Sequence, residues 1–180
     1  KYTDLRALMR EVLPLAPAPD AAALKRAAAA VKLQAIKGAR PLVLVDGVFV
    51  PKLSEVGGLE KGLTVRALRD VLEAGDAALQ AQLLTPDNTN PIVALNSAMM
   101  TDGVVIDVAD GVVLKQPLQI IHVASGPAPA AMFTRSLLRL GKDAGVTLVE
   151  SYTAADGAKA YQAHDSLVVA IGNNSRLDHV

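Results

Sequence analysis

The apolar positions change their spacing near Ala39, which separates a helical first part of the chain from a second part rich in strands. In the first part, Leu5, Leu8, Met9 and Val12 recur at the spacing of one face of a helix. The prolines that follow lack a backbone donor and disrupt a helix. The first helix is therefore expected to end before them.

A second, alanine-rich helix is predicted from Asp20 to about Ile36. Asp20 is a favoured residue at the start of a helix, because its carboxylate accepts a hydrogen bond from an unpaired backbone N–H of the first turn. Gly38 stands where a residue of left-handed conformation commonly ends a helix. The basic residues of this helix are expected on a solvated face; they are Lys25, Arg26, Lys32 and Lys37.

From Pro41 the pattern becomes that of strands. Two apolar runs, Leu42–Val45 and Val48–Val50, flank the dipeptide Asp46-Gly47. This dipeptide is a strong signal for a two-residue hairpin turn, because glycine accepts the positive φ that a type I′ turn needs. The sequence therefore predicts a β-hairpin here.

Short helices are predicted after the hairpin. Their ranges are Val65–Glu73, Ala77–Leu84 and Pro91 to about Met99. Proline suits the first turn of the last of these, where its missing N–H costs no hydrogen bond. The segment Thr85–Pro91 is predicted to be a connector rich in turns.

After Thr101 the chain is predicted to be almost entirely strand and turn, since short apolar runs alternate with glycine, aspartate and asparagine. This regularity is compatible with a β-sandwich, a barrel or a solenoid. The absence of a strict repeat length argues against a solenoid. The predicted strands are Val104–Val108, Val112–Leu114, Leu118–Ala124, Ser136–Leu140, Val146–Tyr152, Leu167–Ile171 and Arg176–His179.

The composition excludes several classes of protein. The 180 residues carry no formal net charge and show no run of lysine and arginine, which argues against a nucleic-acid-binding surface. No apolar run approaches the roughly 18 residues of a membrane span. The chain has no cysteine, so it has neither disulfides nor thiolate metal ligands, in keeping with a cytoplasmic protein. Because only 3% of residues are aromatic, leucine, valine and alanine must fill the core.

The histidines are the first candidates for chemistry. A metal site needs three or four converging ligands, commonly close together on one element. His122, His164 and His179 are scattered along the chain and have no cysteine to assist them. We therefore expect all three to be structural, and we predict no metal-binding and no cofactor-binding residue.

The tripeptide Glu150-Ser151-Tyr152 places a nucleophile type beside an acid. Neighbouring residues of a strand point to opposite faces, so Glu150 and Ser151 are not expected to meet. Glu150 and Tyr152 share a face, where an ordinary cross-strand contact is expected. No catalytic residue is predicted.

Several short motifs follow one another in a fixed order along nearly the whole chain. They are Lys1-Tyr2-Thr3-Asp4-Leu5-Arg6, the run Leu42–Phe49 followed by Pro51, Asn90-Pro91 through Ala94-Leu95-Asn96, Thr101-Asp102-Gly103, Gly111–Leu114 with Pro117, Val149–Tyr152, and Leu177-Asp178-His179. In this order the motifs resemble the SufB/SufD family of iron–sulfur cluster assembly proteins, and SufD subunits in particular.

The resemblance implies a fold that is mainly β with an α/β N-terminal part. In this fold, helices and a small hairpin in residues 1–100 precede the first part of a right-handed parallel β-helix in residues 101–180. The family's β-helix continues further and is followed by helices, so the resemblance implies that this chain is a fragment of a longer subunit. The open end of the β-helix would then favour self-association, for instance as a homodimer.

The resemblance also implies a function. A SufD subunit is a non-catalytic scaffold of the SufBCD complex, so no enzyme activity is expected. Its partners would be SufB, through the β-helices, and SufC, an ATPase bound by C-terminal helices. SufB itself is the weaker match because it supplies cysteine ligands, which this chain lacks. The family's cluster-building and iron-entry residues lie further along and match no position here.

An alternative class is a carbohydrate-active enzyme with a β-helix or β-sandwich fold. Such enzymes use paired carboxylates, and two carboxylates about 5–10 Å apart in an open groove would favour this class. Their sugar-binding aromatic platforms are poorly represented, since the chain has two Phe, three Tyr and no Trp.

Overall fold

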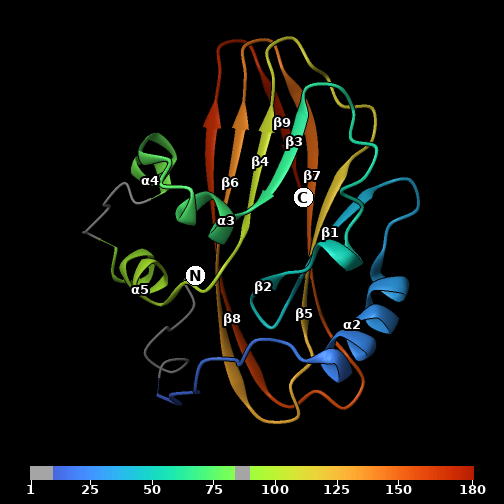
Figure 1. Ribbon diagram of the computed structural model, residues 1–180, viewed down its shortest axis with the longest axis vertical. Helices are drawn as coiled ribbons and strands as arrows, with labels where there is room; N and C mark the ends of the chain where they lie inside the picture. Colours follow the sequence, from blue (N-terminus) through green and yellow to red (C-terminus); the bar gives the residue numbers. More distant parts are fainter. Residues whose placement is uncertain (1–9, 84–89) are drawn as a thin grey trace, which may run out of the picture.

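The computed structural model describes residues 10–83 and 90–180, in which the strands form two sheets that face each other (Figure 1). The order of strands in one sheet is β2 (Val48–Phe49), β1 (Arg40–Val45), β5 (Leu118–Ala124), β7 (Gly145–Ala154) and β9 (Arg176–His179). The order in the other is β3 (Leu63–Ala67), β4 (Val104–Val108), β6 (Ala130–Leu140) and β8 (Tyr161–Ile171). The described helices are α2 (Ala21–Gln34), α3 (Leu68–Glu73), α4 (Ala77–Leu83) and α5 (Pro91–Met99), and a 3-10 turn spans Pro51–Leu53.

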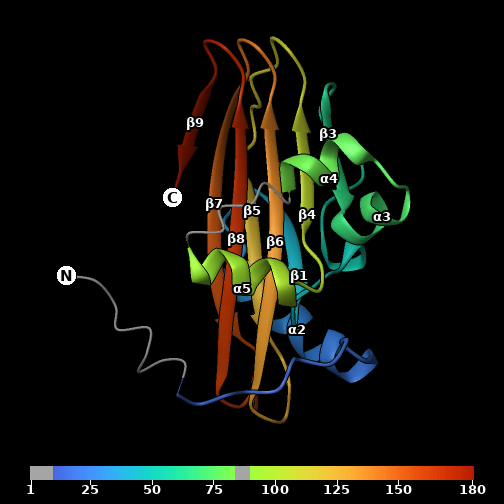
Figure 2. The ribbon, with the colours of Figure 1, turned by 90° about the vertical axis from the view of Figure 1, so that its left-hand side faces the viewer.

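Helices cover the outer face of both sheets. The first sheet is covered by α2, and the second by α3, α4 and α5; Figure 2 shows α5 lying across β6 and β8. Because β1 and β5 are buried on both faces, their sequences are mostly apolar without strict alternation, which explains why both were predicted. The core between the sheets includes Leu42, Leu44, Ile106, Leu118, Ile120, Leu138 and Leu148.

From β4 onward the chain passes alternately from one sheet to the other. Strands β4, β6 and β8 are parallel neighbours in the second sheet, and β5, β7 and β9 are parallel neighbours in the first. Paired residues are 30 to 32 positions apart, as in Leu118 with Leu148 and Val105 with Leu137. The strand pairing thus repeats about every 31 residues, although no strict repeat length is visible in the sequence.

Most predicted elements with a local signal are confirmed. Helix α2 begins after Asp20, whose carboxylate accepts a hydrogen bond from the Ala23 N–H at 2.7 Å. The hairpin turn has positive φ at Asp46 (48°) and Gly47 (83°), as a type I′ turn requires. Strand β9 has the predicted bounds, and α5 starts at Pro91. The predicted first helix, apart from residues 10–12, and nearly all of the predicted connector lie outside the described residues; residues 10–12 are not helical.

The helix predicted over Val65–Glu73 is wrong in its first part. Leu63–Ala67 forms β3, which pairs antiparallel with β4, and only Leu68–Glu73 is helical. The β-branched side chains of Thr64 and Val65 suit a strand, and the neighbouring β4 supplies the backbone partners. The strand predicted at Val112–Leu114 is reduced to a single bridge between Val113 and Gly145.

Strands β6 and β8 are longer than predicted. Their predicted ranges, Ser136–Leu140 and Leu167–Ile171, are only the apolar second halves of strands that begin at Ala130 and Tyr161. The first halves contain polar residues whose pattern did not indicate burial. These halves pair with each other residue by residue over their whole length.

Strands from residues 1–100 share sheets with strands from residues 101–180, since β1 pairs with β5 and β3 pairs with β4. The division of the chain into two regions at residue 100 stays a prediction. In residues 10–83 and 90–180, no helix combines the length and the apolar character that crossing a membrane requires.

A buried carboxylate joins the hairpin to the second sheet. Asp102 is 1% exposed, and its two oxygens accept hydrogen bonds from the backbone N–H groups of Phe49 (3.0 Å) and Arg69 (3.1 Å). The residue before α3, Ala67, makes no side-chain cap, so Asp102 satisfies an N–H of the first turn in its place. The motif Thr101-Asp102-Gly103 therefore fixes the position of α3 against β2.

Gly103 lies where two strands approach closely. A Cβ atom at this position would be 1.9 Å from the carbonyl oxygen of Arg135, a distance that no side chain tolerates. By contrast, a Cβ atom at Gly57 would meet nothing within 4 Å. Glycine at position 103 is thus required by the space between β4 and β6.

We expect Gly103→Ala to lower the free energy of unfolding by at least about 2–3 kcal/mol, because the backbone of β4 or β6 must move. Gly57→Ala is the matched control and is expected to change stability little. Urea unfolding followed by circular dichroism measures both. Equal stability of the two variants would contradict the close approach.

An ionic ladder crosses the second sheet near residue 107. The Asp107 carboxylate contacts the Arg139 guanidinium and lies 3.1 Å from Arg66 Nη2. Partial burial alone would raise the pKa of Asp107, but hydrogen bonds and positive charges from Arg139 and Arg66 together hold that pKa below its ordinary value of 3.8. The ladder therefore stabilises the folded state while Asp107 is ionised.

We expect Asp107→Asn to lower the free energy of unfolding at pH 7 by up to about 1 kcal/mol, since the pair is partly exposed. A depressed pKa stabilises the fold above the unfolded value and loses this effect as the pH falls through the folded value. The difference from the wild type should therefore shrink as the pH falls below the ordinary aspartate value of about 4. Thermal unfolding at pH 7, 5 and 3 tests this, with exposed Asp156→Asn as control; a difference that is unchanged at pH 3 would contradict it.

Candidate functional site

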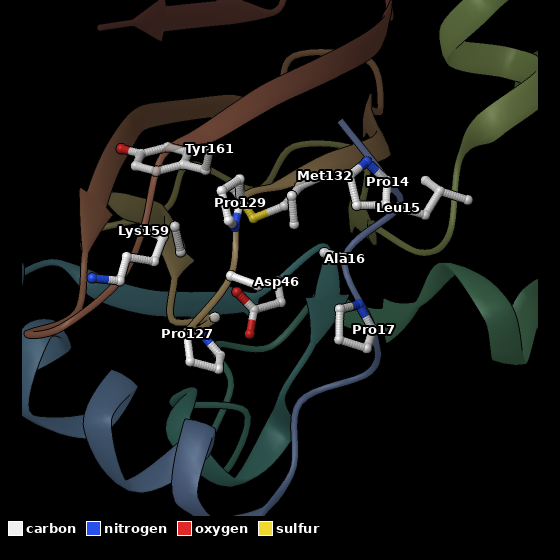
Figure 3. Close-up of a pocket in the computed structure, with 14 residues that line it drawn as sticks. Pro14, Leu15, Ala16, Pro17, Asp46, Pro127, Pro129, Met132, Lys159 and Tyr161 are labelled. Atoms are coloured by element: carbon white, nitrogen blue, oxygen red, sulfur yellow. The ribbon is translucent and has the colours of Figure 1, made fainter. Parts of the chain in front are cut away.

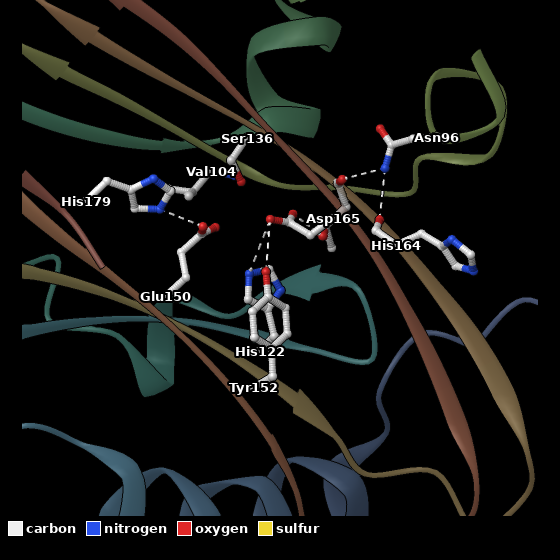
Figure 4. Close-up of polar contacts among 10 residues, drawn as sticks. Asn96, Val104, His122, Ser136, Glu150, Tyr152, His164, Asp165 and His179 are labelled. Atoms are coloured by element: carbon white, nitrogen blue, oxygen red, sulfur yellow. Dashed lines mark hydrogen bonds and ion pairs between the residues drawn. The ribbon is translucent and has the colours of Figure 1, made fainter. Parts of the chain in front are cut away.

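Polar side chains from both sheets converge in the space between them (Figure 4). His122 extends from β5 and Glu150 from β7, whereas Asp165 extends from β8 of the opposite sheet. One ligand-type atom from each of these three residues lies within 4.8 Å of the other two. Tyr152 of β7 and His179 of β9 border the group.

The strand register explains why these residues meet. His122 and Tyr152 are direct neighbours across β5 and β7, and their rings stack with centroids 4.7 Å apart. Thr134 and Asp165 are direct neighbours across β6 and β8, and the Thr134 hydroxyl donates a hydrogen bond to Asp165 Oδ1 at 2.5 Å. Each contact joins residues about one coil apart, so neither is visible as a local sequence motif.

Side chains along β7 alternate between the two faces of the sheet, as predicted. Glu150 and Tyr152 both face the cluster, whereas Ser151 points to the other side. There the Ser151 hydroxyl accepts a hydrogen bond at 2.9 Å from Gln119, whose amide also bonds the backbone near the end of α2. Ser151 therefore helps to hold α2 on its sheet and does not contact the acid beside it in sequence.

His122 is the most buried member of the cluster, with 5% exposure. Burial lowers its pKa, and the nearby Asp165 charge opposes this change only in part. The Nε2 atom lies 3.9 Å from Asp165 Oδ2, beyond hydrogen-bonding distance, and has no hydrogen-bond partner among the described residues. A neutral imidazole thus presents an unpaired nitrogen to two carboxyl groups.

Glu150 is harder to ionise than a free glutamate. Burial is the largest cause that raises the pKa of Glu150, and the charge and hydrogen bonding of Asp165 raise it further. The hydrogen bond and charge of His179 lower it. His179 Nε2 lies 2.7 Å from Glu150 Oε2, and Glu150 Oε1 is buried without a hydrogen-bond partner among the described residues. Burial and these acids also raise the pKa of Tyr152, which keeps its phenol protonated to donate to Asp165 at 3.4 Å.

His164 lies outside this cluster. Because it is the neighbour of Asp165 on β8, its side chain points to the opposite face of the sheet. There it stacks on Phe133, its neighbour across β6 and β8, with ring centroids 4.4 Å apart. Burial lowers its pKa. His122 and His179 are far apart in the sequence, yet both lie beside the acidic pair, whereas His164 does not. The prediction that the three histidines are structural stays a prediction.

A buried amide holds the strands that carry Thr134 and Asp165. Asn96 of α5 donates hydrogen bonds to the backbone carbonyls of Thr134 (2.9 Å) and His164 (2.8 Å), and its own oxygen accepts one from Arg135. It thereby joins β6 to β8 from outside the sheet. This network holds the strands on either side of Asp165, a residue that no sequence motif indicated.

A separate cavity of about 190 Å³ lies near the turn between β1 and β2 (Figure 3). Its lining is mostly apolar and includes Pro14, Pro17, Pro127 and Met132. Asp46 reaches it, but both carboxylate oxygens already accept hydrogen bonds from the Ser125 backbone N–H and hydroxyl. The convergent polar groups of the molecule are therefore in the cluster of Figure 4, which offers one nitrogen and two carboxylate groups to a metal ion.

Comparison with known proteins gives two matches. A family model described as the SufBD protein N-terminal region matches residues 32–120, from the end of α2 to the start of β5. An iron–sulfur cluster assembly SufBD family protein of Synechocystis sp. is 26% identical over 148 residues, which make up 77% of this chain and 33% of the relative. The chain thus spans about a third of the length of that relative. Both matches are to proteins described as members of the SufB/SufD family.

We expect Asn96→Ala to lower the free energy of unfolding by about 1–3 kcal/mol, because two buried carbonyls and Arg135 lose a partner. Ser97→Ala on the same helix is the control, since that hydroxyl bonds only the Val93 carbonyl within α5. Chemical denaturation measures both variants. A loss for Asn96→Ala no larger than that for Ser97→Ala would contradict a positioning role for Asn96.

Proposed function

We propose that this protein is a SufD-type, non-catalytic scaffold subunit of a SufBCD complex for iron–sulfur cluster assembly. The observation that carries the proposal is the match of residues 32–120 to the SufBD N-terminal region. The family matches point to iron–sulfur cluster assembly. The absence of cysteine favours a SufD-like over a SufB-like role, because thiolates are the usual cluster ligands. The proposal places the protein in the cytoplasm.

The proposal extends to the fold. We infer that β4 to β9 are the first coils of a right-handed parallel β-helix. Support comes from the alternation between two sheets, the parallel pairing and the 30-to-32-residue spacing of paired positions. In a β-helix each coil buries its inner face against its neighbours, as the core between these sheets does.

The outer edge formed by β8 and β9 supports an assembly role. In the described part of the chain each of these strands pairs on one side only, with β6 and β7 respectively. A free strand edge is a template for a further strand. Val169 and Ile171 are 37% and 55% exposed on β8, next to this edge. We propose that further coils or a SufB subunit cover it, and that the isolated chain pairs with a second copy there.

The carbohydrate-enzyme alternative lacks a supporting observation. Glu150 and Asp165 are a pair of carboxyl groups, but their side chains are only 14% and 9% exposed. A sugar chain needs an open groove between its two catalytic acids. The aromatic side chains near the pair, His122 and Tyr152, stack on each other and leave no flat face free between them.

The test is assembly with the proposed partners. A natural gene product that contains residues 1–180 is expressed together with SufB and SufC of the same genome. We expect one complex on size-exclusion chromatography that retains an iron–sulfur cluster after anaerobic reconstitution. The 180-residue chain alone, as control, should retain no cluster, because it lacks thiolates, and should not bind SufC.

Two outcomes would contradict the proposal. Failure of the natural gene product to associate with SufB or SufC would contradict the scaffold role. A stoichiometric cluster on the isolated 180-residue chain, seen by its visible absorbance after desalting, would show that ligands other than thiolates suffice and that the role assigned to the partners is wrong.

A further inference from the structure

The cluster of His122, Glu150 and Asp165 has features that its own hydrogen bonds do not explain. The three side chains come from three strands and both sheets, yet their ligand-type atoms lie within 4.8 Å of one another. Two carboxyl groups that face each other in a buried place repel when both are ionised. A bound cation would remove this repulsion.

Unpaired polar atoms point to the same place. His122 Nε2 is buried and has no hydrogen-bond partner among the described residues, and the same holds for Glu150 Oε1. Buried polar atoms without a partner are rare in native proteins, and a bound ion is a recognised explanation for them. The His122 side chain is 5% exposed, so surrounding water does not satisfy its nitrogen.

Neighbouring side chains already orient the carboxylates. His179 Nε2 lies 2.7 Å from Glu150 Oε2, the oxygen opposite the unpaired one. Thr134 donates to Asp165 Oδ1 and Tyr152 donates to Asp165 Oδ2. Hydrogen bonds of this kind from a second layer of residues hold the ligands of metal sites in position.

We propose that His122, Glu150 and Asp165 bind one divalent transition-metal ion of the Zn²⁺ or Fe²⁺ type. A neutral imidazole favours these ions over Ca²⁺ and Mg²⁺, which prefer ligand sets made of oxygen alone. Three protein ligands leave a further position for water. The site departs from the expectation that these histidines are structural, and it does not depend on the proposed function of the protein.

The ion would join the two sheets. His122 and Glu150 belong to β5 and β7 of one sheet, and Asp165 belongs to β8 of the other. Metal–ligand bonds of about 2.0–2.2 Å require donor atoms roughly 3 Å apart, so the three side chains must draw closer when the ion binds. Binding should therefore stabilise the folded chain, because an unfolded chain has no such arrangement of ligands.

The experiment is a Zn²⁺ titration of the untagged 180-residue chain after treatment with a chelator. Isothermal titration calorimetry and metal analysis after desalting are expected to show one Zn²⁺ per chain, and the melting temperature should rise with Zn²⁺. His122→Gln, Glu150→Gln and Asp165→Asn are each expected to weaken binding at least tenfold. His164→Gln is the matched control, because that histidine lies on β8 outside the cluster, and it should bind as the wild type does.

Folding of each metal-free variant is checked by circular dichroism, so that loss of binding is separated from loss of structure. If His122→Gln does not fold, X-ray absorption of the Zn²⁺-loaded wild type tests whether His122 is a ligand. The proposal predicts a spectrum with one imidazole nitrogen and otherwise oxygen ligands. The absence of stoichiometric binding by the wild type, tight binding by His122→Gln, or equal weakening by His164→Gln would overturn the proposal. Any of these results leaves the test of assembly with SufB and SufC unaffected.

Discussion

Parallel pairing between strands that lie 30 to 32 residues apart in the sequence is the constraint on which the rest of this structure depends. It places β5, β7 and β9 next to one another in that order in one sheet, and β4, β6 and β8 in that order in the other. The inward side chains of both sheets then share one core of leucine, isoleucine and valine, so few aromatic residues are needed. The helices pack on the outer faces of the sheets that this pairing defines. Just before β4, the close approach of Gly103 to β6 and the hydrogen bonds of the Asp102 carboxylate constrain both the space and the backbone position.

The same pairing creates the polar cluster. Parallel pairing in register places one residue of each strand beside one residue of the next, so one polar residue per strand suffices to build a group of them. His122 beside Tyr152 and Thr134 beside Asp165 arise in this way. The facing sheets then bring the two pairs together. A cluster of this kind is held by backbone hydrogen bonds along several strands, and it needs no loop to position its residues.

The elements that were predicted correctly are those whose formation depends on residues close together in the sequence. Capping by Asp20, the turn at Asp46-Gly47 and the apolar runs of β1 and β5 each carry their own signal, and the structure agrees with them. The sequence did not predict β3, where pairing with β4 overrides a helical pattern, nor the first halves of β6 and β8, which include polar residues. For the site, alternation along β7 predicted that Glu150 and Tyr152 share a face. His122 and Asp165 lie beside them only because of the register between strands that are far apart in the sequence. No short stretch of sequence shows this register.

The register also determines where the chain tolerates changes in length. One extra residue inside β8 would turn every following side chain of that strand to the opposite face, which would expose apolar residues and bring polar ones inward. The same insertion between β7 and β8, in residues 155–160, would only lengthen a connection between two sheets. Among related chains, length differences should therefore collect at the ends of the coils, while the distance in sequence between paired strands drifts. That drift hides the repeat from any comparison of the chain with itself.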